Sequence, residues 1–160
     1  MDRHDLLVAV LRTARTNGLT GEPTIHAMAR GINRFGGATL PKISEALRNK
    51  QYTSERVGRT DLKHGSVRVK VSLDDRVAVV ALKPKRSDAA PHPHRPVEVV
   101  VTTIMFESED EAAWDDLSSR KGGCSHSDLV EVERRREADK ALERHLRDTC
   151  PESVFEMLRF

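Results

Sequence analysis

The 160-residue chain has only two cysteines, few aromatic side chains and no long run of apolar residues. Two cysteines, Cys124 and Cys150, are too few for a disulfide framework, so we expect reduced thiols and an intracellular protein, cytoplasmic or nuclear. No apolar run reaches the roughly 18–20 residues that span a bilayer, so we expect no membrane partner. Aromatic residues make up only 4% of the chain, which predicts a small, aliphatic core.

The sequence also lacks a recognisable catalytic pattern. A catalytic site needs a nucleophile near a base, or paired acids in a pocket. The acid pairs Asp74–Asp75 and Asp115–Asp116 instead fall in a predicted turn and on a predicted helix face. Gly31 and Gly36–Gly37 fit neither a P-loop nor a dinucleotide fingerprint and predict a simple turn. We therefore predict a protein that is not an enzyme and needs no cofactor.

One set of metal-ligand residue types stands near the C-terminus. Cys124, His126, His145 and Cys150 offer the donor atoms that zinc prefers. About twenty residues of predicted helix separate the two halves of this set by roughly 30 Å unless the chain folds back. We therefore keep these four residues as candidates and predict no metal site.

The charges that are present divide the chain in two. Residues 1–106 hold 18 Lys and Arg against 10 Asp and Glu, a net charge of +8, whereas residues 107–160 hold 9 against 15, a net charge of −6. A basic front and an acidic back indicate a polyanion-binding face with a different role for the tail. The alternative is that both are ordinary solvated surfaces.

Periodicity in the basic part predicts both helices and strands. Apolar residues repeat at helical spacing over 2–17 and 40–50, and Val-rich segments predict strands at 67–72, 77–82 and 97–106. The short segment 24–28 fits either type, and its β-branched residues favour a strand. The linker 83–96 contains four prolines, which exclude regular structure.

These elements predict an α/β (α+β) fold. We expect a small sheet of three or four strands, packed by two N-terminal helices, in a domain over residues 5–106. We expect an acidic helical tail over 107–160, with helices at 108–118 and 127–148 and an apolar terminus at 154–160.

The basic side chains of the front part form the candidate binding surface. Lysine and arginine neutralise phosphates and release counterions, which needs charge on one face but no fixed spacing. The candidates are Arg30, Arg34, Lys42, Arg48, Lys50, Arg68, Lys70, Lys83, Lys85, Arg86 and Arg95. Four of them lie in the segment 83–95, where a flexible basic loop suits a backbone clamp.

Residues 6–106 resemble the Alba family of small nucleic-acid-binding proteins. The sequence segments that carry this resemblance are HDLLVAVLRTARTNG, EPTIHAMARGINR and ISEALRNKQYTSERVGRTDL, and predicted strands around a basic loop follow them. The resemblance implies two helices on a four-stranded sheet and a protein that usually dimerises. It also implies that Arg30, Asn33, Arg34 and the 83–95 loop contact the backbone of RNA or DNA.

Two other interpretations stay open. In a winged-helix DNA-binding protein, residues 2–17, 23–35 and 39–50 become three helices, and Lys42, Ser44 and Arg48 face a groove of DNA. A helical segment at 24–29 favours this interpretation, and a strand there favours the Alba-like one. In a structural or adaptor subunit, the sheet and the apolar terminus instead dock on protein partners.

We predict a non-enzymatic protein that contacts the phosphate backbone, with RNA favoured over DNA. The acidic tail is expected to bind a protein partner, to mediate self-association, or to mask the basic face.

Overall fold

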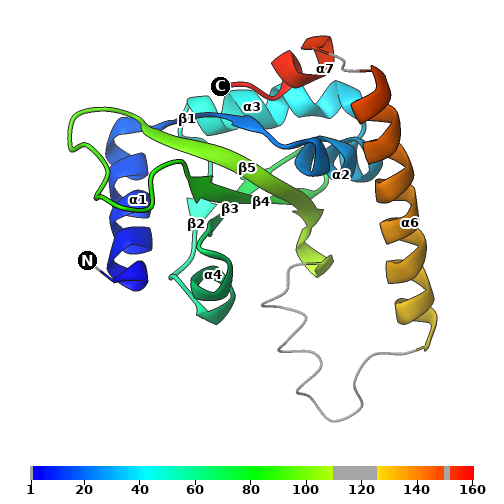
Figure 1. Ribbon diagram of the computed structural model, residues 1–160, viewed down its shortest axis with the longest axis horizontal. Helices are drawn as coiled ribbons and strands as arrows, with labels where there is room; N and C mark the ends of the chain where they lie inside the picture. Colours follow the sequence, from blue (N-terminus) through cyan, green and yellow to red (C-terminus); the bar gives the residue numbers. More distant parts are fainter. Residues whose placement is uncertain (1, 110–125, 150–151) are drawn as a thin grey trace.

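A five-stranded mixed sheet, in the order β1-β5-β4-β3-β2, forms the centre of the fold (Figure 1). The computed structural model describes residues 2–109, 126–149 and 152–160. The strands are β1 (Leu19–Pro23), β2 (Thr53–Ser54), β3 (Val67–Ser72), β4 (Val77–Pro84) and β5 (Val97–Phe106). Strand β1 runs parallel to β5, and the other neighbours are antiparallel. The mixed α/β class is confirmed, but the sheet has five strands rather than the three or four expected.

Alternation of side chains fixes which face of the sheet is buried. Val67, Val69 and Val71 are buried in the core, whereas Arg68 and Lys70 between them point to the other face and are partly exposed. Successive side chains of a strand point to opposite faces, so an alternating sequence predicts one buried face. The three strands predicted from this pattern, β3, β4 and β5, are confirmed.

Helices before and between the strands complete the core. They are α1 (Arg3–Asn17), α2 (Ile25–Phe35), the 3₁₀ helix η1 (Gly37–Thr39), α3 (Leu40–Arg48) and α4 (Arg59–His64). Buried side chains of α1, α2 and α3 join those of the sheet in one apolar cluster. The helices predicted over 2–17 and 40–50 are therefore confirmed.

The strand favoured at residues 24–28 is wrong, because α2 begins there. The side chain of Thr24 accepts a hydrogen bond from the backbone N–H of Ala27, and this cap starts the helix. Ala27, Met28 and Gly31 then lie on its buried face. Gly31 lies inside α2 rather than in the predicted turn, and a Cβ at this position would stand 2.8 Å from Cδ2 of Leu40. The glycine lets α2 pack closely against the start of α3.

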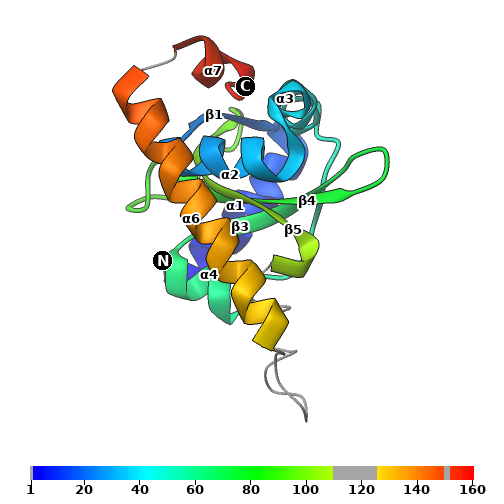
Figure 2. The same cartoon turned by 90° about the vertical axis from the view of Figure 1, so that its right-hand side faces the viewer.

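The tail contains α6 (His126–Thr149) and α7 (Glu152–Met157), preceded by the 3₁₀ helix η2 (Glu107–Glu109). The helix predicted over 127–148 is confirmed, and the one predicted over 108–118 falls mainly outside the described residues. Helix α6 contacts α2, and Figure 2 shows it crossing in front of that helix. Leu146 and Leu158 are buried in the same cluster as the sheet. The apolar terminus is therefore packed largely against its own chain.

Candidate nucleic-acid interface

The three candidates on α2 lie beneath α6. The guanidinium of Arg34 donates to both carboxylate oxygens of Asp139, at 2.7 and 2.9 Å, and its Nε donates to Glu109 at 2.8 Å. The side chain of Asn33 also donates to Asp139, at 3.0 Å. Arg30 forms ion pairs of 3.3 Å with Glu109 and 3.8 Å with Asp139. In this arrangement, acidic groups of η2 and α6 pair with all three candidates.

The two carboxylates of this cluster are held ionised. Burial alone would raise the pKa of Asp139, but hydrogen bonds from Arg34 and Asn33 outweigh it and lower that pKa. Burial would also raise the pKa of Glu109. Hydrogen bonds from the side chain of Arg34 and from the backbone N–H of Phe106 outweigh this effect and lower that pKa. A charged, hydrogen-bonded acid favours its ionised form. The ion pairs therefore persist at neutral pH and hold α6 against α2.

The candidates on β3 are also paired with acids. Arg68 donates to Asp61 at 2.8 Å, and Asp61 in turn accepts from the backbone N–H of Gly58 at the start of α4. Lys70 lies 2.8 Å from Glu55 and 3.1 Å from Glu107. These pairs join the far face of the sheet to the segments beside it, so they explain both cations without a ligand.

Arg48 and Lys50 lie at a different place, beside the C-terminal end of α1. The ammonium of Lys50 donates to the carbonyl of Thr16 at 3.2 Å, and Arg48 donates to the carbonyl of Arg159 at 3.4 Å. Both side chains are exposed. Arg48 is the last residue of α3 and Lys50 follows it. Figure 1 shows this end of α3 next to the end of α1.

The basic β4–β5 loop reaches the same end of the molecule. The side-chain amide of Asn17 donates to the carbonyl of Pro93 at 2.8 Å, and the N–H of Val97 donates to the carbonyl of Gly18 at 3.0 Å. Lys85, at the start of the loop, lies 4.0 Å from Glu22 of β1. The loop that carries Lys85, Arg86 and Arg95 is thus anchored to the chain around Gly18. Lys83, two residues before it on β4, is exposed.

We call this region the basic end. It comprises exposed cations from α1, the end of α3, the β4–β5 loop and the C-terminal segment: Arg15, Arg48, Lys50, Lys85, Arg86, Arg95 and Arg159. Acids also lie in or beside these segments. Glu22 lies 3.8 Å from Arg159, Glu152 lies 3.4 Å from Arg159, and Asp88 lies 3.6 Å from Arg86; the remaining acids are Glu98 and Glu156. Cations therefore outnumber acids, and they come from parts of the chain far apart in sequence.

Two members of the basic end, Arg15 and Arg159, are absent from the sequence-based candidates. Arg15 lies in the last turn of α1, and its place two residues before the end of the predicted helix 2–17 is a recognisable signal, because basic residues are favoured at helix C-termini. The local sequence around Arg159 does not predict that this side chain lies at the basic end, because its position depends on the backbone pairing of Phe160 with Gly21. Of the original candidates, Lys42 lies elsewhere, 3.8 Å from Asp74.

Three of the four zinc candidates fall outside what the structure describes, so the zinc hypothesis is not tested. Cys124 and Cys150 lie outside the described residues, as does the side chain of His126. His145 is exposed on α6.

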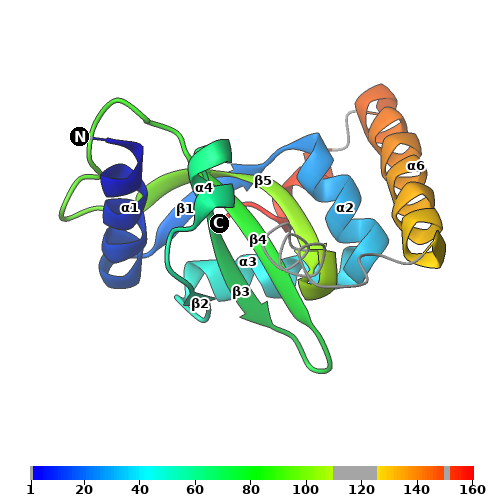
Figure 3. The same cartoon turned by 90° about the horizontal axis from the view of Figure 1, so that it is seen from below.

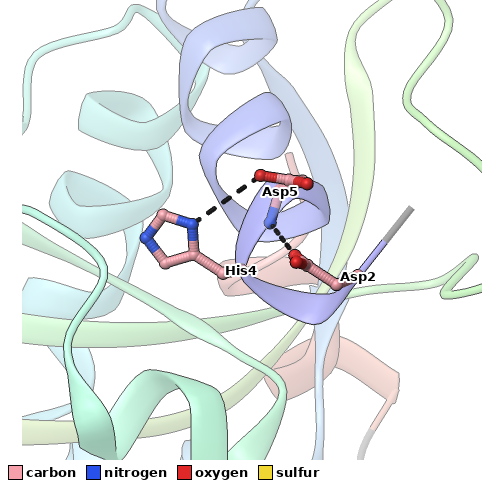
Figure 4. Close-up of side chains that lie close together, drawn as sticks. All are labelled: Asp2, His4 and Asp5. Carbon is pink, nitrogen blue, oxygen red and sulfur yellow. Dashed lines mark hydrogen bonds and ion pairs between the residues drawn. The ribbon is translucent and has the colours of Figure 1, made fainter.

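A small acidic cluster lies at the other end of α1 (Figure 4). Asp2, His4 and Asp5 are exposed and place their ligand-type atoms within 4.8 Å of one another. The side chain of Asp2 accepts from the N–H of Asp5 at 2.8 Å, which is an ordinary helix cap. Capping and the favourable helix dipole account for these acids.

The winged-helix interpretation meets one obstacle in α3. Ser44, expected to face DNA, is 3% exposed, and its hydroxyl donates to the carbonyl of Arg159 at 2.7 Å. The helical segment at 24–29 agrees with that interpretation, whereas a five-stranded sheet is larger than the hairpin that it expects.

Comparison with known proteins adds no relative: no family model, curated protein or solved structure matches this chain. The resemblance to the Alba family therefore stays a prediction. Among the described residues, no helix is both long enough and apolar enough to cross a membrane.

Proposed function

We propose that this chain is a non-enzymatic protein that binds the phosphate backbone of a nucleic acid through the basic end. The observation that supports the proposal is the meeting of exposed cations from four separate segments around the end of α1. Backbone binding needs clustered positive charge and releases counterions from the nucleic acid. The residues beneath α6 have a structural role here, because Arg30 and Arg34 are already paired with acids.

The proposed contact is with phosphates rather than with bases. Binding of single-stranded bases uses exposed aromatic platforms. Phe35 and Phe106 instead pack edge to face on each other at 5.0 Å, and the hydroxyl of Tyr52 donates to the carbonyl of Ala14. The exposed rings nearest the basic end are His92 and His94, on the loop itself. We therefore expect little sequence preference, and RNA is the first ligand to test because of the family resemblance.

A gel-shift series over rising salt tests the proposal, with single- and double-stranded RNA and DNA as ligands. We expect binding to every backbone at low salt and a linear fall of the logarithm of the binding constant with the logarithm of the salt concentration. Absence of binding at low salt, or binding that salt leaves unchanged, contradicts the proposal.

A further inference from the structure

The β4–β5 loop carries an exposed serine directly after a group of cations. Three exposed basic residues stand four, two and one positions before Ser87: Lys83, Lys85 and Arg86. Protein kinases choose their substrates in part by the charges around the acceptor hydroxyl. A kinase whose substrate groove is acidic selects a serine that follows lysine and arginine, because opposite charges attract across an interface. The charges before Ser87 fit this class of kinase.

The backbone around Ser87 is irregular and held at two points. The N–H of Lys85 donates to the carbonyl of Glu98 at 3.0 Å, and Pro93 makes the contact with α1 described above. Between these two anchors, the described residues make no hydrogen bond to the backbone of residues 86–92. The hydroxyl of Ser87 has no hydrogen-bond partner among them either. Figure 3 shows the loop beside α1, extending away from the sheet. The hydroxyl can therefore enter a kinase active site without unfolding of the domain.

Thr16 provides an internal comparison, because it also follows basic residues. Arg12 and Arg15 stand four and one positions before it, and its side chain is exposed. Thr16 nevertheless lies in α1, and its hydroxyl donates to the carbonyl of Arg12 at 3.4 Å. A kinase must place the acceptor hydroxyl in line with the γ-phosphate of ATP, which a residue fixed in a helix does not allow without unwinding. Charge alone makes both residues candidates, and the backbone geometry favours Ser87.

We propose that Ser87 is a phosphorylation site for a kinase that selects serine preceded by basic residues, and that its phosphate weakens nucleic-acid binding at the basic end. The transfer forms a bond between Oγ of Ser87 and the γ-phosphorus of ATP. It breaks the bond from that phosphorus to the oxygen that bridges it to the β-phosphate, so ADP leaves. The hydroxyl proton passes to the catalytic aspartate of the kinase.

The phosphate changes the charge of the basic end in two ways. It adds roughly −1.5 to −2 charges at pH 7, which repel the phosphates of a nucleic acid. It also competes for Lys85 and Arg86, whose acidic neighbours Glu22 and Asp88 lie 4.0 and 3.6 Å away. Phosphate oxygens accept strong, charge-assisted hydrogen bonds from such cations. The effect on binding rests on the proposed function, whereas the modification of Ser87 does not.

Incubation of the full-length chain with ATP and purified kinases of this class tests the site. The probes are the catalytic subunit of cyclic-AMP-dependent protein kinase and protein kinase C. Mass spectrometry of the intact chain and of its proteolytic fragments locates the phosphate. We expect one phosphate per chain, on Ser87, and none on Thr16. Ser87→Ala is the control and should take up no phosphate. Absence of phosphate on Ser87 with both kinases, or equal uptake on Thr16, overturns the assignment of the site.

Gel shifts with the phosphorylated chain test the consequence. We expect the affinity for every nucleic acid to fall about tenfold and the salt slope to fall by about two, because two cations no longer neutralise phosphates. Kinase-treated Ser87→Ala is the matched control and should bind as the untreated parent does. Equal binding by the phosphorylated and unmodified chains overturns the effect on binding. A failure of the unmodified chain to bind contradicts the proposed function and that effect together, but not the modification of Ser87.

Discussion

Arg34 of α2 and Asp139 of α6 form a two-point ion pair between residues 105 positions apart in the chain, with hydrogen bonds of 2.7 and 2.9 Å. Their side chains are only 3% and 6% exposed. Glu109 and Asn33 complete the hydrogen bonding around the pair. A buried charge without its partner is far more costly than an exposed one. We therefore expect this pair to contribute strongly to holding α6 on the domain.

Replacing Asp139 with Asn should destabilise the fold by about 3 kcal/mol, because it leaves the buried Arg34 short of a counter-charge. Urea unfolding followed by circular dichroism measures the change. The matched control is Glu137→Gln, an exposed acid two residues away on α6, which should change stability by less than about 0.5 kcal/mol. A loss below about 1 kcal/mol for Asp139→Asn would show that α6 does not depend on the pair.

Acid should weaken the same contact. Burial raises the pKa of Asp139 and of Glu109, but hydrogen bonds and charges from arginines lower each pKa overall in the folded state. The unfolded chain therefore binds more protons at low pH, so stability rises with pH and is lost as pH falls through the folded pKa values. Their stabilisation is complete about one pH unit above the unfolded pKa values of about 4, and it declines as the pH falls below about 5.

Urea midpoints between pH 7 and pH 3 measure this dependence. The Asp139→Asn variant has one carboxylate fewer to protonate, so its curve should be flatter than that of the parent. Equal slopes for the two proteins would assign the acid sensitivity to other carboxylates, such as Glu55, whose pKa is lowered chiefly by its hydrogen bond with Lys70.

Local pattern was enough to predict most of the regular elements. Val67, Val69 and Val71 alternate with polar residues, and this pattern alone located β3. The sequence did not predict strand β1, because its segment LTGEP contains glycine and proline, which are unfavourable in strands. Its pairing with β5 also joins residues that are far apart in the chain. Residues 24–28 were misassigned because the Thr24 cap, rather than the β-branched composition, decides where α2 begins.

The candidate site shows the same division between local and distant information. A sequence reveals that Arg34 and Lys50 are basic, but their partners lie elsewhere in the chain. Arg34 is neutralised by Asp139 of the tail, whereas Lys50 donates to a backbone carbonyl, that of Thr16, and has no acidic partner within the part of the chain that the structure describes. Charge composition could therefore predict a basic part of the chain, but it could not separate cations that stabilise the fold from those that remain exposed.

Gly21 should not tolerate a side chain. A Cβ at this position would lie 2.1 Å from the carbonyl oxygen of Val99 on β5, where the neighbouring atoms are backbone and cannot move aside. We expect Gly21→Ala to cost about 3 kcal/mol, at the upper end of overpacking effects. It should also loosen the pairing with Phe160, which hydrogen exchange at the Gly21 and Phe160 amides would detect.

Gly37→Ala is the control for this substitution. No atom lies within 4 Å of a Cβ at Gly37, and its backbone is not in the left-handed region. Its stability should therefore match that of the parent or exceed it slightly, since alanine reduces the freedom of the unfolded chain. Similar losses for both variants would mean that the β1–β5 contact is not the cause.

Removal of charge at the basic end gives the sharpest separation between binding and folding. Lys50→Gln, Lys85→Gln and Arg86→Gln all change exposed side chains, so stability should change by less than about 0.5 kcal/mol for each. If each cation contacts a phosphate, each substitution lowers the slope of binding against salt by about one. The three together should weaken binding to every nucleic acid tested, because phosphates carry no sequence information.

Lys140→Gln is the control, since Lys140 is an exposed cation on α6, away from the basic end. It changes the net charge by the same amount as each single substitution. If the cations act only through the overall electrostatic field of the protein, Lys140→Gln should weaken nucleic-acid binding as much as Lys50→Gln does. Direct phosphate contacts instead predict a changed salt slope for Lys50→Gln and an unchanged slope for Lys140→Gln, because counterion release counts only the phosphates that the protein neutralises. Equal slopes for these two variants would remove the basic end from the binding mechanism.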